Sequence, residues 1–228
     1  IFVAGQVPTD FRAGIHPEAQ VNPVFWEGSP IRRQADFVLK NLALTLEAAG
    51  SGMEQVVKAQ IWLADMADLP RFEASWRAVF PHAPPARTVL PCTGYGALGS
   101  LLEINPLALR EGGRVCKEPV NASCPIPLGH ASAAVRAGEL VFLSGLSASD
   151  GNGLIPAGAV DPGFPYASSS IRAQTEWILD QADALCRAAG ARLRDAVRQQ
   201  VFYTDLREFD ASYRALADRC GEEMPATS

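Results

Sequence analysis

The 228-residue sequence lacks the features that mark disulfide scaffolds, zinc sites and membrane spans. Its five cysteines are odd in number and form no Cys-x-x-Cys pair, so they predict neither a disulfide framework nor a metal site. They fit free thiols in a reducing cytoplasm. No apolar run approaches the roughly 20 residues that a bilayer-spanning helix needs. The sequence therefore predicts a cytoplasmic protein that holds no metal and does not contact a membrane.

An excess of positive charge is also missing. The formal net charge is −5, and no stretch concentrates lysine and arginine. A nucleic-acid-binding surface normally needs such a concentration to displace counterions, so the composition argues against nucleic acid as the main partner. With 48% hydrophobic and 20% charged residues, the chain has the balance of a globular protein. Its length suits one large domain or two of ordinary size.

What the sequence does contain is an internal repeat. Residues 1–5 (IFVAG) resemble residues 141–145 (VFLSG), an offset of 140 positions. The same offset relates 31–34 to 171–174 and 48–50 to 188–190, and after a three-residue shortening 72–77 matches 209–214. Pro85-Ala86 then returns to the offset at Pro225-Ala226. So many ordered matches indicate that one small domain occurs twice.

The repeat suggests domain boundaries. We predict a first domain at residues 1–111, a linker rich in glycine, proline and cysteine at 112–128, and a second domain at 129–228. The two copies are cut unequally: 134–140 has no counterpart at the start of the first copy, and 88–110 has none at the end of the second. Either the sequence is trimmed at both ends, or a neighbouring subunit completes each half.

The periodicities within one copy predict an α+β domain. Apolar residues recur at helical spacing from Ile31 to Ala49, with Ser29 as a candidate N-cap and Gly50 just past the end. Further elements are predicted as a strand at 57–63, a helix from Asp68 to Val79, and strands at 87–90 and 100–109. The resulting order predicts a mixed sheet with two helices on one face.

Two charged residues stand at strand positions where they could act on a substrate. Arg87 opens an apolar strand, and its planar guanidinium can bind a carboxylate through two hydrogen bonds. Glu103 alternates with apolar neighbours and could deprotonate a water. The pattern alone favours the plainer alternative for both, a side chain with its charged end in solvent.

Three motifs resemble the Rid/YjgF family of imine and enamine deaminases. Residues 39–86 show its order of helix, strand and helix, Pro85-Ala86-Arg87-Thr88 is similar to its Pro-Ala-Arg-Ser/Thr signature, and residues 102–109 (LEINPLAL) are similar to its closing strand. The resemblance implies that each repeat adopts a chorismate-mutase-like fold. It also implies assembly as trimers with pockets between adjacent barrels.

The resemblance also implies roles for particular residues. Arg87 would grip the carboxylate of a 2-imino or 2-enamino acid, and Glu103 would orient the water that hydrolyses the C=N bond, with no cofactor. The positions of Gly5, Val89, Ser144 and Gly145 would contact the substrate. The expected partners are a small carboxylate metabolite and further copies of the chain.

Several positions depart from the family pattern. Ala4 and Ala131 replace a small hydroxyl residue and a tyrosine, and Val89 replaces a common cysteine. In the second repeat Thr227 stands where the arginine should be, so we expect the active site in the first repeat. Three alternatives remain: a non-catalytic module that binds a carboxylate metabolite, a chorismatase-like hydrolase, and a ribonuclease, which the negative charge disfavours.

Overall fold

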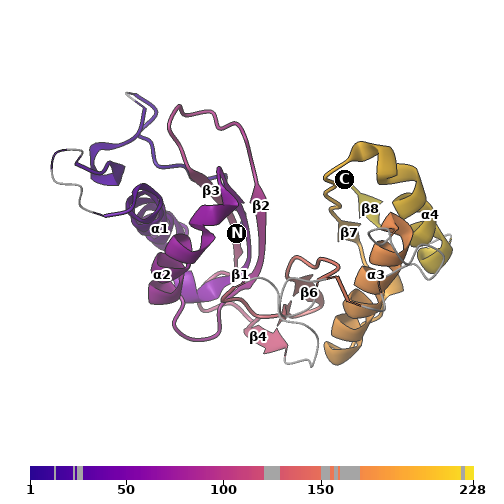
Figure 1. Cartoon of the computed structure of the whole chain (residues 1–228). Coiled ribbons are helices and arrows are strands. Elements are labelled where there is room, and N and C mark those ends of the chain that lie inside the picture. Colours follow the sequence, from indigo (N-terminus) through magenta and orange to yellow (C-terminus); the bar gives the residue numbers. More distant parts are fainter. Residues whose placement is uncertain are drawn as a thin grey trace. The chain divides into compact units, whose positions relative to one another are not determined.

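The computed structural model describes residues 1–12, 14–22, 24, 28–120, 129–149, 155–156, 159, 170–221 and 224–228. The chain divides into two compact units (Figure 1). The first comprises Ile1–Pro119 and Pro127–Gly145, and the second comprises Val120–Ile126 and Leu146–Ser228. These bounds differ from those of the repeats, because the first 17 residues of the predicted second domain, 129–145, belong to the first unit.

The first unit is built on a three-stranded sheet in the order β2-β1-β3. The central strand β1 (Val56–Leu63) runs parallel to β2 (Ala86–Pro91) and antiparallel to β3 (Leu102–Ala108). Residues of these strands alternate between the two faces of the sheet. The predicted mixed sheet is confirmed.

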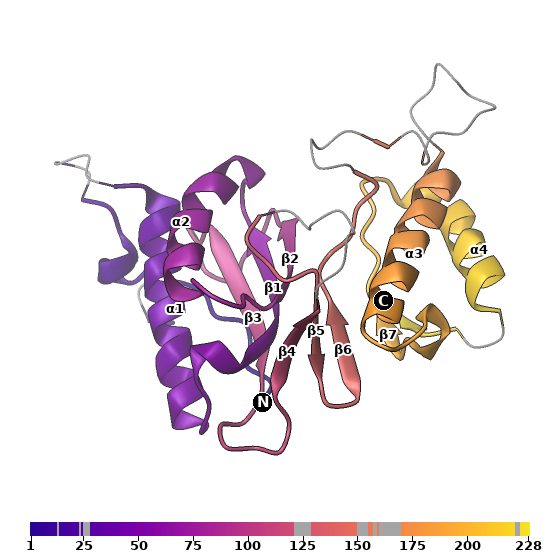
Figure 2. The same ribbon diagram turned by 90° about the horizontal axis from the view of Figure 1, so that it is seen from below.

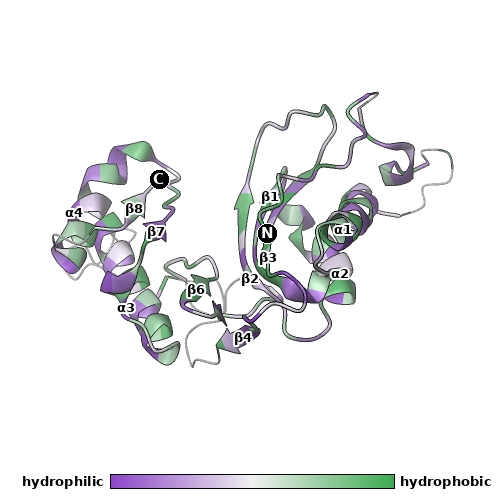
Figure 3. Cartoon of the chain, turned by 180° about the vertical axis from the view of Figure 1, so that it is seen from behind, coloured by the Kyte–Doolittle hydropathy of each residue, from purple (hydrophilic) through white to green (hydrophobic). Residues whose placement is uncertain are grey.

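Two helices, α1 (Pro30–Ala48) and α2 (Leu69–Val79), cover one face of this sheet. Both are amphipathic, and hydrophobic and hydrophilic residues alternate along them (Figure 3). The main core joins their apolar stripes to the sheet residues Ala59, Ile61 and Ile104. Gly50 follows α1 with φ +74°, the left-handed conformation expected just past a helix end. The predicted arrangement of two helices on one face is therefore confirmed.

The N-terminal segment forms isolated bridges instead of a continuous strand. Phe2 pairs with Leu107 and Gln6 with Ile104, both antiparallel. Between these bridges lies Pro106 of β3, which has no N–H to donate to the segment beside it. The ladder is interrupted there, so the N-terminal segment pairs with β3 only at isolated bridges.

A second small sheet, in the order β4-β5-β6, lies beside the first (Figure 2). Its strands are β4 (Lys117–Val120), β5 (Ala134–Ala137) and β6 (Leu140–Leu143). Strand β4 falls inside the predicted linker, and residues 121–128 of that linker lie outside the described part of the chain. Ser132, just before this hairpin, pairs with Ala86 at the start of β2. The opening of the second repeat thus completes the first unit.

The second unit repeats the core elements of the first. Helices α3 (Ile171–Ala188) and α4 (Phe209–Cys220) correspond to α1 and α2, and β7 (Arg198–Gln199) pairs parallel with β8 (Ala226–Thr227). Arg198 lies opposite Ala226, as Lys58 lies opposite Ala86 in the first unit, so the pairing register is the same after the offset of 140. The structural correspondence supports the duplication read from the sequence.

Short 3₁₀ helices connect several of these elements. They are η1 (Pro17–Ala19), η2 (Met53–Gln55), η3 (Met66–Asp68), η5 (Leu193–Asp195) and η6 (Leu206–Glu208). Among the described residues, no helix is long and apolar enough to cross a membrane. The same residues contain no cluster of three or more histidine, cysteine or acidic side chains that could bind a metal.

Candidate functional site

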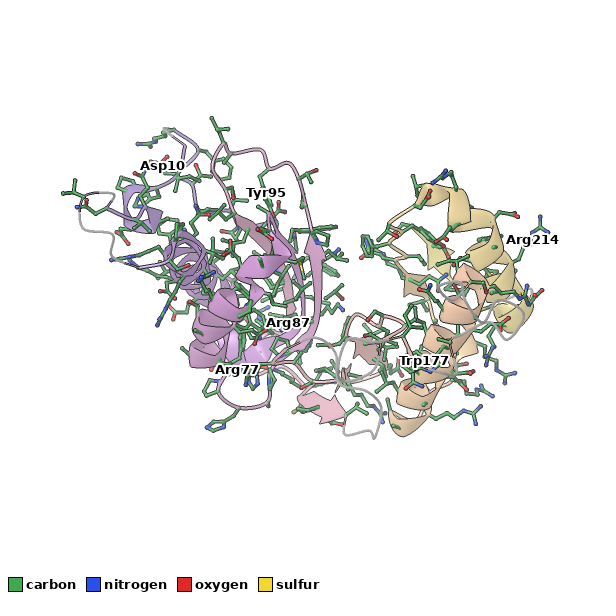
Figure 4. All side chains as sticks on the ribbon, in the orientation of Figure 1. Asp10, Arg77, Arg87, Tyr95, Trp177 and Arg214 are labelled. Atoms are coloured by element: carbon green, nitrogen blue, oxygen red, sulfur yellow. The ribbon has the colours of Figure 1, made fainter. Side chains whose placement is uncertain are left out.

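Arg87 lies on the face of the sheet that α1 and α2 cover. It is opposite Ala59 in the register of β2 and β1, and its side chain reaches α2 (Figure 4). The residue is only 2% exposed. Its guanidinium Nη2 donates a hydrogen bond to Oε1 of Glu73, forming an ion pair. The solvent-facing alternative for Arg87 is therefore wrong, because the guanidinium is buried and holds a carboxylate.

The surroundings of Arg87 suit a buried cation. Burial lowers the pKa of the guanidinium, and the neighbouring Glu73 carboxylate opposes that shift. The Cζ atom lies 5.1 Å from the centroid of the Trp76 ring, a distance at which the ring face attracts a cation. Arginine stays charged even in such a place, since its intrinsic pKa is very high. The result is a fixed positive charge that is matched by one carboxylate and one aromatic face.

Gly129 and His130 cover this ion pair. The backbone N–H of His130 donates to Oε2 of Glu73 over 3.1 Å, and its carbonyl accepts from Trp76 Nε1 over 2.8 Å. Gly129 has φ +81°, and a Cβ there would overlap Glu73 Oε1 and Arg87 Nη2. Only glycine can therefore place its backbone so close to the pair.

The His130 ring fastens this covering segment to α2. Its Nε2 donates to the carbonyl of Phe80 over 2.7 Å, and its Nδ1 lies 3.2 Å from Arg77 Nη1, from which it accepts. Arg77 also lies 3.6 Å from Oε2 of Glu73. Both ring nitrogens are thus engaged, and His130 joins the second repeat's opening segment to the helix that carries Glu73.

Ser144 and Gly145 clamp the backbone of Arg87 from the other side. The N–H of Arg87 donates to Ser144 Oγ over 2.7 Å, and its carbonyl accepts from the N–H of Gly145 over 2.9 Å. Ser144 Oγ in turn donates to the carbonyl of Ser132 over 2.6 Å. Gly145 also lies against Thr88, where a Cβ would stand 2.9 Å from Thr88 Cγ2. The structure therefore brings three of the predicted site residues together: Arg87, Ser144 and Gly145.

Replacing Ser144 with alanine is expected to destabilise the first unit by about 1–3 kcal/mol, because the buried N–H of Arg87 would lose its acceptor. Urea unfolding followed by tryptophan fluorescence measures this change. The control is Ser147→Ala, which removes an exposed hydroxyl three residues away. Equal stability of the two variants would contradict a structural role for the Ser144 clamp.

Glu103 lies on the opposite face of the same sheet. It pairs with Trp62 of β1, whereas the neighbouring Ile104 points into the helix-covered core. Its Oε1 accepts from Asn105 Nδ2 over 3.1 Å, and a Cβ on Gly5 would overlap that carboxylate. The structure therefore brings Gly5 and Glu103 together but keeps Glu103 away from Arg87.

Tyr95 belongs to the surroundings of Glu103. Its hydroxyl is buried and has no hydrogen-bond partner in the described part of the chain. Burial raises the pKa of Tyr95 above its usual range, and nearby Cys92 and Glu103 add to the shift. Figure 4 shows Tyr95 and Arg87 well apart along the sheet. The remaining predicted contact, Val89, packs against the main core on the helix side.

Lys58 is a further charge, partly buried, that sequence reasoning missed. Its Nζ donates to Thr88 Oγ1 over 2.7 Å and to the carbonyl of Leu143 over 2.6 Å. Burial lowers the pKa of this amine to about 8. The side chain ties β1 to β2 and to β6, on the face of the sheet that the helices leave uncovered.

In the described part of the second repeat there is no equivalent of the Arg87 pair. Asp210 is the counterpart of Glu73, but its carboxylate is 72% exposed and pairs with Arg214, 2.9 Å away on the same helix. Thr227 stands in the place of Arg87, and Tyr213 in that of Trp76 is 42% exposed. Among the residues that the structure describes, the enclosed guanidinium–carboxylate pair thus occurs in the first repeat and has no counterpart at the matching positions of the second.

The sequence held a partial signal for Glu73. It precedes Trp76 by three residues and Arg77 by four, so all three share one side of a helix. Nothing in that spacing shows that Arg87 of a distant strand meets the same side. Gly129 and His130 gave no signal, because their role depends on where the second repeat's opening segment folds.

The fold and these contacts define a tandem α+β protein with one enclosed guanidinium–carboxylate pair. The family model for Endoribonuclease L-PSP matches residues 1–110 and, again, 122–228. The chain therefore belongs to this family and contains two copies of its domain. The predicted tandem Rid/YjgF relationship is confirmed.

Individual relatives match about half of the chain. A RutC family protein of Saccharolobus solfataricus is 32% identical over 90 residues, which are 40% of this chain and 64% of the relative. Reactive Intermediate Deaminase A, chloroplastic, of Arabidopsis thaliana is 32% identical over 115 residues, 50% of this chain and 56% of that protein. The chain thus spans less than two thirds of the length of each of these two relatives. A solved structure of a YjgF protein family member from Neisseria meningitidis is 24% identical, covering 49% of this chain and 80% of its own, with a TM-score of 0.39.

Proposed function

We propose that the chain hydrolyses small 2-imino or 2-enamino acids to 2-oxo acids and ammonia, and that Arg87 anchors the substrate carboxylate. In this reaction the oxygen of a water attacks C2, the C–N bond breaks, and the nitrogen leaves as ammonia. The family and the deaminase relative support the reaction class. The observation that carries the proposal is the enclosed Arg87 guanidinium, which already holds a carboxylate in the structure, that of Glu73.

The chemistry needs little machinery. A charge-assisted fork fixes the carboxylate and with it the position of the reactive carbon. A carboxylate that orients and deprotonates water supplies the remaining step, and proximity contributes much of the acceleration. No cofactor is part of the proposed reaction.

Glu103 can serve this reaction only from another copy of the chain. Within one chain, the sheet separates Glu103 from Arg87, since the two residues occupy opposite faces. We therefore place the complete pocket between copies of a homo-oligomer, with a trimer as the favoured assembly. The small carboxylate metabolite and the neighbouring copies are the only partners that the proposal requires.

Ammonia release from freshly generated 2-iminobutyrate tests the proposal. Arg87→Gln is expected to lower kcat/KM by about 10- to 100-fold through loss of a charged hydrogen bond. Glu103→Gln is expected to lower kcat by about 100-fold or more through loss of the base. Arg136→Gln, which changes an exposed arginine, is the control. Unaltered ammonia release in the folded Arg87 variant would overturn the anchoring role.

Mixing the two impaired variants tests whether copies share the pocket. Hybrid oligomers formed by co-expression of Arg87→Gln and Glu103→Gln chains would contain some pockets with both native residues. Recovery of part of the activity is expected if the residues come from different copies. A mixture no more active than the two variants measured separately would contradict the shared pocket.

A non-catalytic carboxylate-binding module is the second candidate. The observation that favours it is the placement of Glu103 away from Arg87 within the chain. Such a module would bind 2-oxobutyrate through Arg87 and leave the decay of 2-iminobutyrate unchanged. Binding without acceleration, in the intact oligomer, would select this candidate.

A further inference from the structure

The carboxylate site of Arg87 is already occupied from within the molecule. Glu73 uses one carboxylate oxygen to accept from the guanidinium and the other to accept from the backbone N–H of His130. A substrate carboxylate held by a two-hydrogen-bond fork that includes Nη2 would compete with Glu73 for that nitrogen. An internal group competes strongly with a dissolved one, because its effective concentration is set by the fold.

The same carboxylate also holds the covering segment in place. Gly129 lies so close that a Cβ would overlap both Glu73 Oε1 and Arg87 Nη2. The His130 N–H has Glu73 as its acceptor, so a Glu73 side chain that leaves Arg87 also leaves His130. Occupancy of the arginine is therefore coupled to one of the hydrogen bonds that hold the covering segment in place.

From these contacts we propose that Glu73 is a built-in competitor, which closes the Arg87 site in the empty protein and is displaced by the carboxylate of the ligand. This inference rests on the proposed role of Arg87 in binding a small carboxylate. The displacement frees the N–H of His130 and removes the Glu73 contact of Gly129, while the bonds of His130 to Trp76, Phe80 and Arg77 still hold it on α2. The apparent affinity for a ligand is then the intrinsic affinity reduced by the fraction of molecules in which Glu73 has left.

The second repeat supplies a matched comparison. Asp210 occupies the position of Glu73 but faces solvent and pairs with Arg214 of its own helix. Thr227 stands in the place of Arg87, so that repeat has no guanidinium at this strand position for the acidic residue to cover. The acidic residue at this helix position thus pairs with a strand arginine in the first repeat, and with an arginine of its own helix in the second.

Titration calorimetry with 2-oxobutyrate, which has the carboxylate but no imine to hydrolyse, tests the inference. Glu73→Gln is expected to bind at least about tenfold more tightly than the native chain, because an amide offers one acceptor where the carboxylate offers two. Asp210→Asn removes the corresponding charge in the second repeat and is expected to bind like the native chain. Arg87→Gln is expected to lose binding.

A second variant destabilises the same closed state without removing a charge. Gly129→Ala places a Cβ where Glu73 and Arg87 lie and forces the covering segment outward, so it too is expected to bind 2-oxobutyrate more tightly. In the native protein, amide hydrogen exchange at residues 129–133 is expected to rise when 2-oxobutyrate binds. A purely structural Glu73–Arg87 pair would give no such ligand-linked change.

The outcomes separate this inference from the proposed function. If Glu73→Gln and Gly129→Ala are folded and bind no more tightly than the native chain, the competitor role is overturned. The function stands in that case as long as Arg87→Gln still abolishes ammonia release. If Arg87→Gln binds 2-oxobutyrate and releases ammonia like the native chain, the proposed function itself fails, and the competitor role with it.

Discussion

Replacing Arg87 with methionine is expected to lower the free energy of unfolding of the first unit by about 3–5 kcal/mol. The substitution leaves the Glu73 carboxylate, only 13% exposed, without its guanidinium. Removing one partner of a buried ion pair costs far more than the pair itself contributes, since an uncompensated charge remains away from water. The cation–π contact between the Arg87 guanidinium and the Trp76 ring is lost as well.

The double variant Arg87→Met, Glu73→Gln separates the cost of an uncompensated buried carboxylate from the cost of lost packing. Because it leaves no buried charge uncompensated, we expect it to be more stable than Arg87→Met alone. Urea unfolding followed by tryptophan fluorescence reports mainly on the first unit, which contains Trp26, Trp62 and Trp76, whereas the second contains Trp177. Arg136→Met, at an exposed position, is the control. A double variant no more stable than the single one would show that lost packing, and not the lone carboxylate, sets the cost.

The second large effect concerns Lys58 and pH. Its pKa is lowered by burial to about 8 in the folded protein, from 10.5 as the ordinary value. Between these two values the unfolded chain binds more protons at this site than the folded one, so stability rises with pH. At 1.36 kcal/mol per pKa unit, the rise from this residue is about 3 kcal/mol between pH 8 and 10.5. Below pH 8 the ammonium is charged in both states, and the contribution is constant.

Comparison with Lys58→Met isolates this contribution. We expect the stability of the native chain relative to Lys58→Met to increase as the pH is raised from 7 to 10.5, as measured by urea unfolding at each pH. Arg198 is the corresponding exposed residue in the second repeat, and the stability of the native chain relative to Arg198→Met should not change over this pH range. Parallel stability curves for the native chain and Lys58→Met would contradict the burial of a titrating amine between Thr88 and Leu143.

Local patterns were sufficient for much of the fold. Helical spacing of apolar residues places α1 within a residue of its observed bounds, because a helix that buries one stripe must repeat its apolar residues at that spacing. Alternation likewise located β1 and β3. Local patterns did not reveal the interrupted pairing of the N-terminal segment, since they do not show that Pro106 faces it and withholds a hydrogen bond.

The sequence by itself determined that the domain is duplicated, that each copy builds helices over strands, and that Arg87 is a residue to examine. These properties are carried by short-range spacing and by the offset of 140, both of which are written along the chain. Only the tertiary structure decided what surrounds Arg87. Glu73, Gly129 and Ser144 come from three separate segments. Backbone folding alone brings Glu73 and Ser144 into hydrogen bonds with Arg87 and places Gly129 against its guanidinium.

The tertiary structure also decided that Arg87 and Glu103 are not neighbours. Both sit on strands of one sheet, and sequence reasoning joined them because their types suit one reaction. The side on which a residue projects depends on pairing register, and Arg87 shares its side with Ala59 while Glu103 shares its side with Trp62. Successive residues of a strand point to opposite faces. A shift of one residue in the pairing of β3 would therefore bring Glu103 to the face of Arg87, whereas the observed register keeps the two side chains on opposite sides of the sheet.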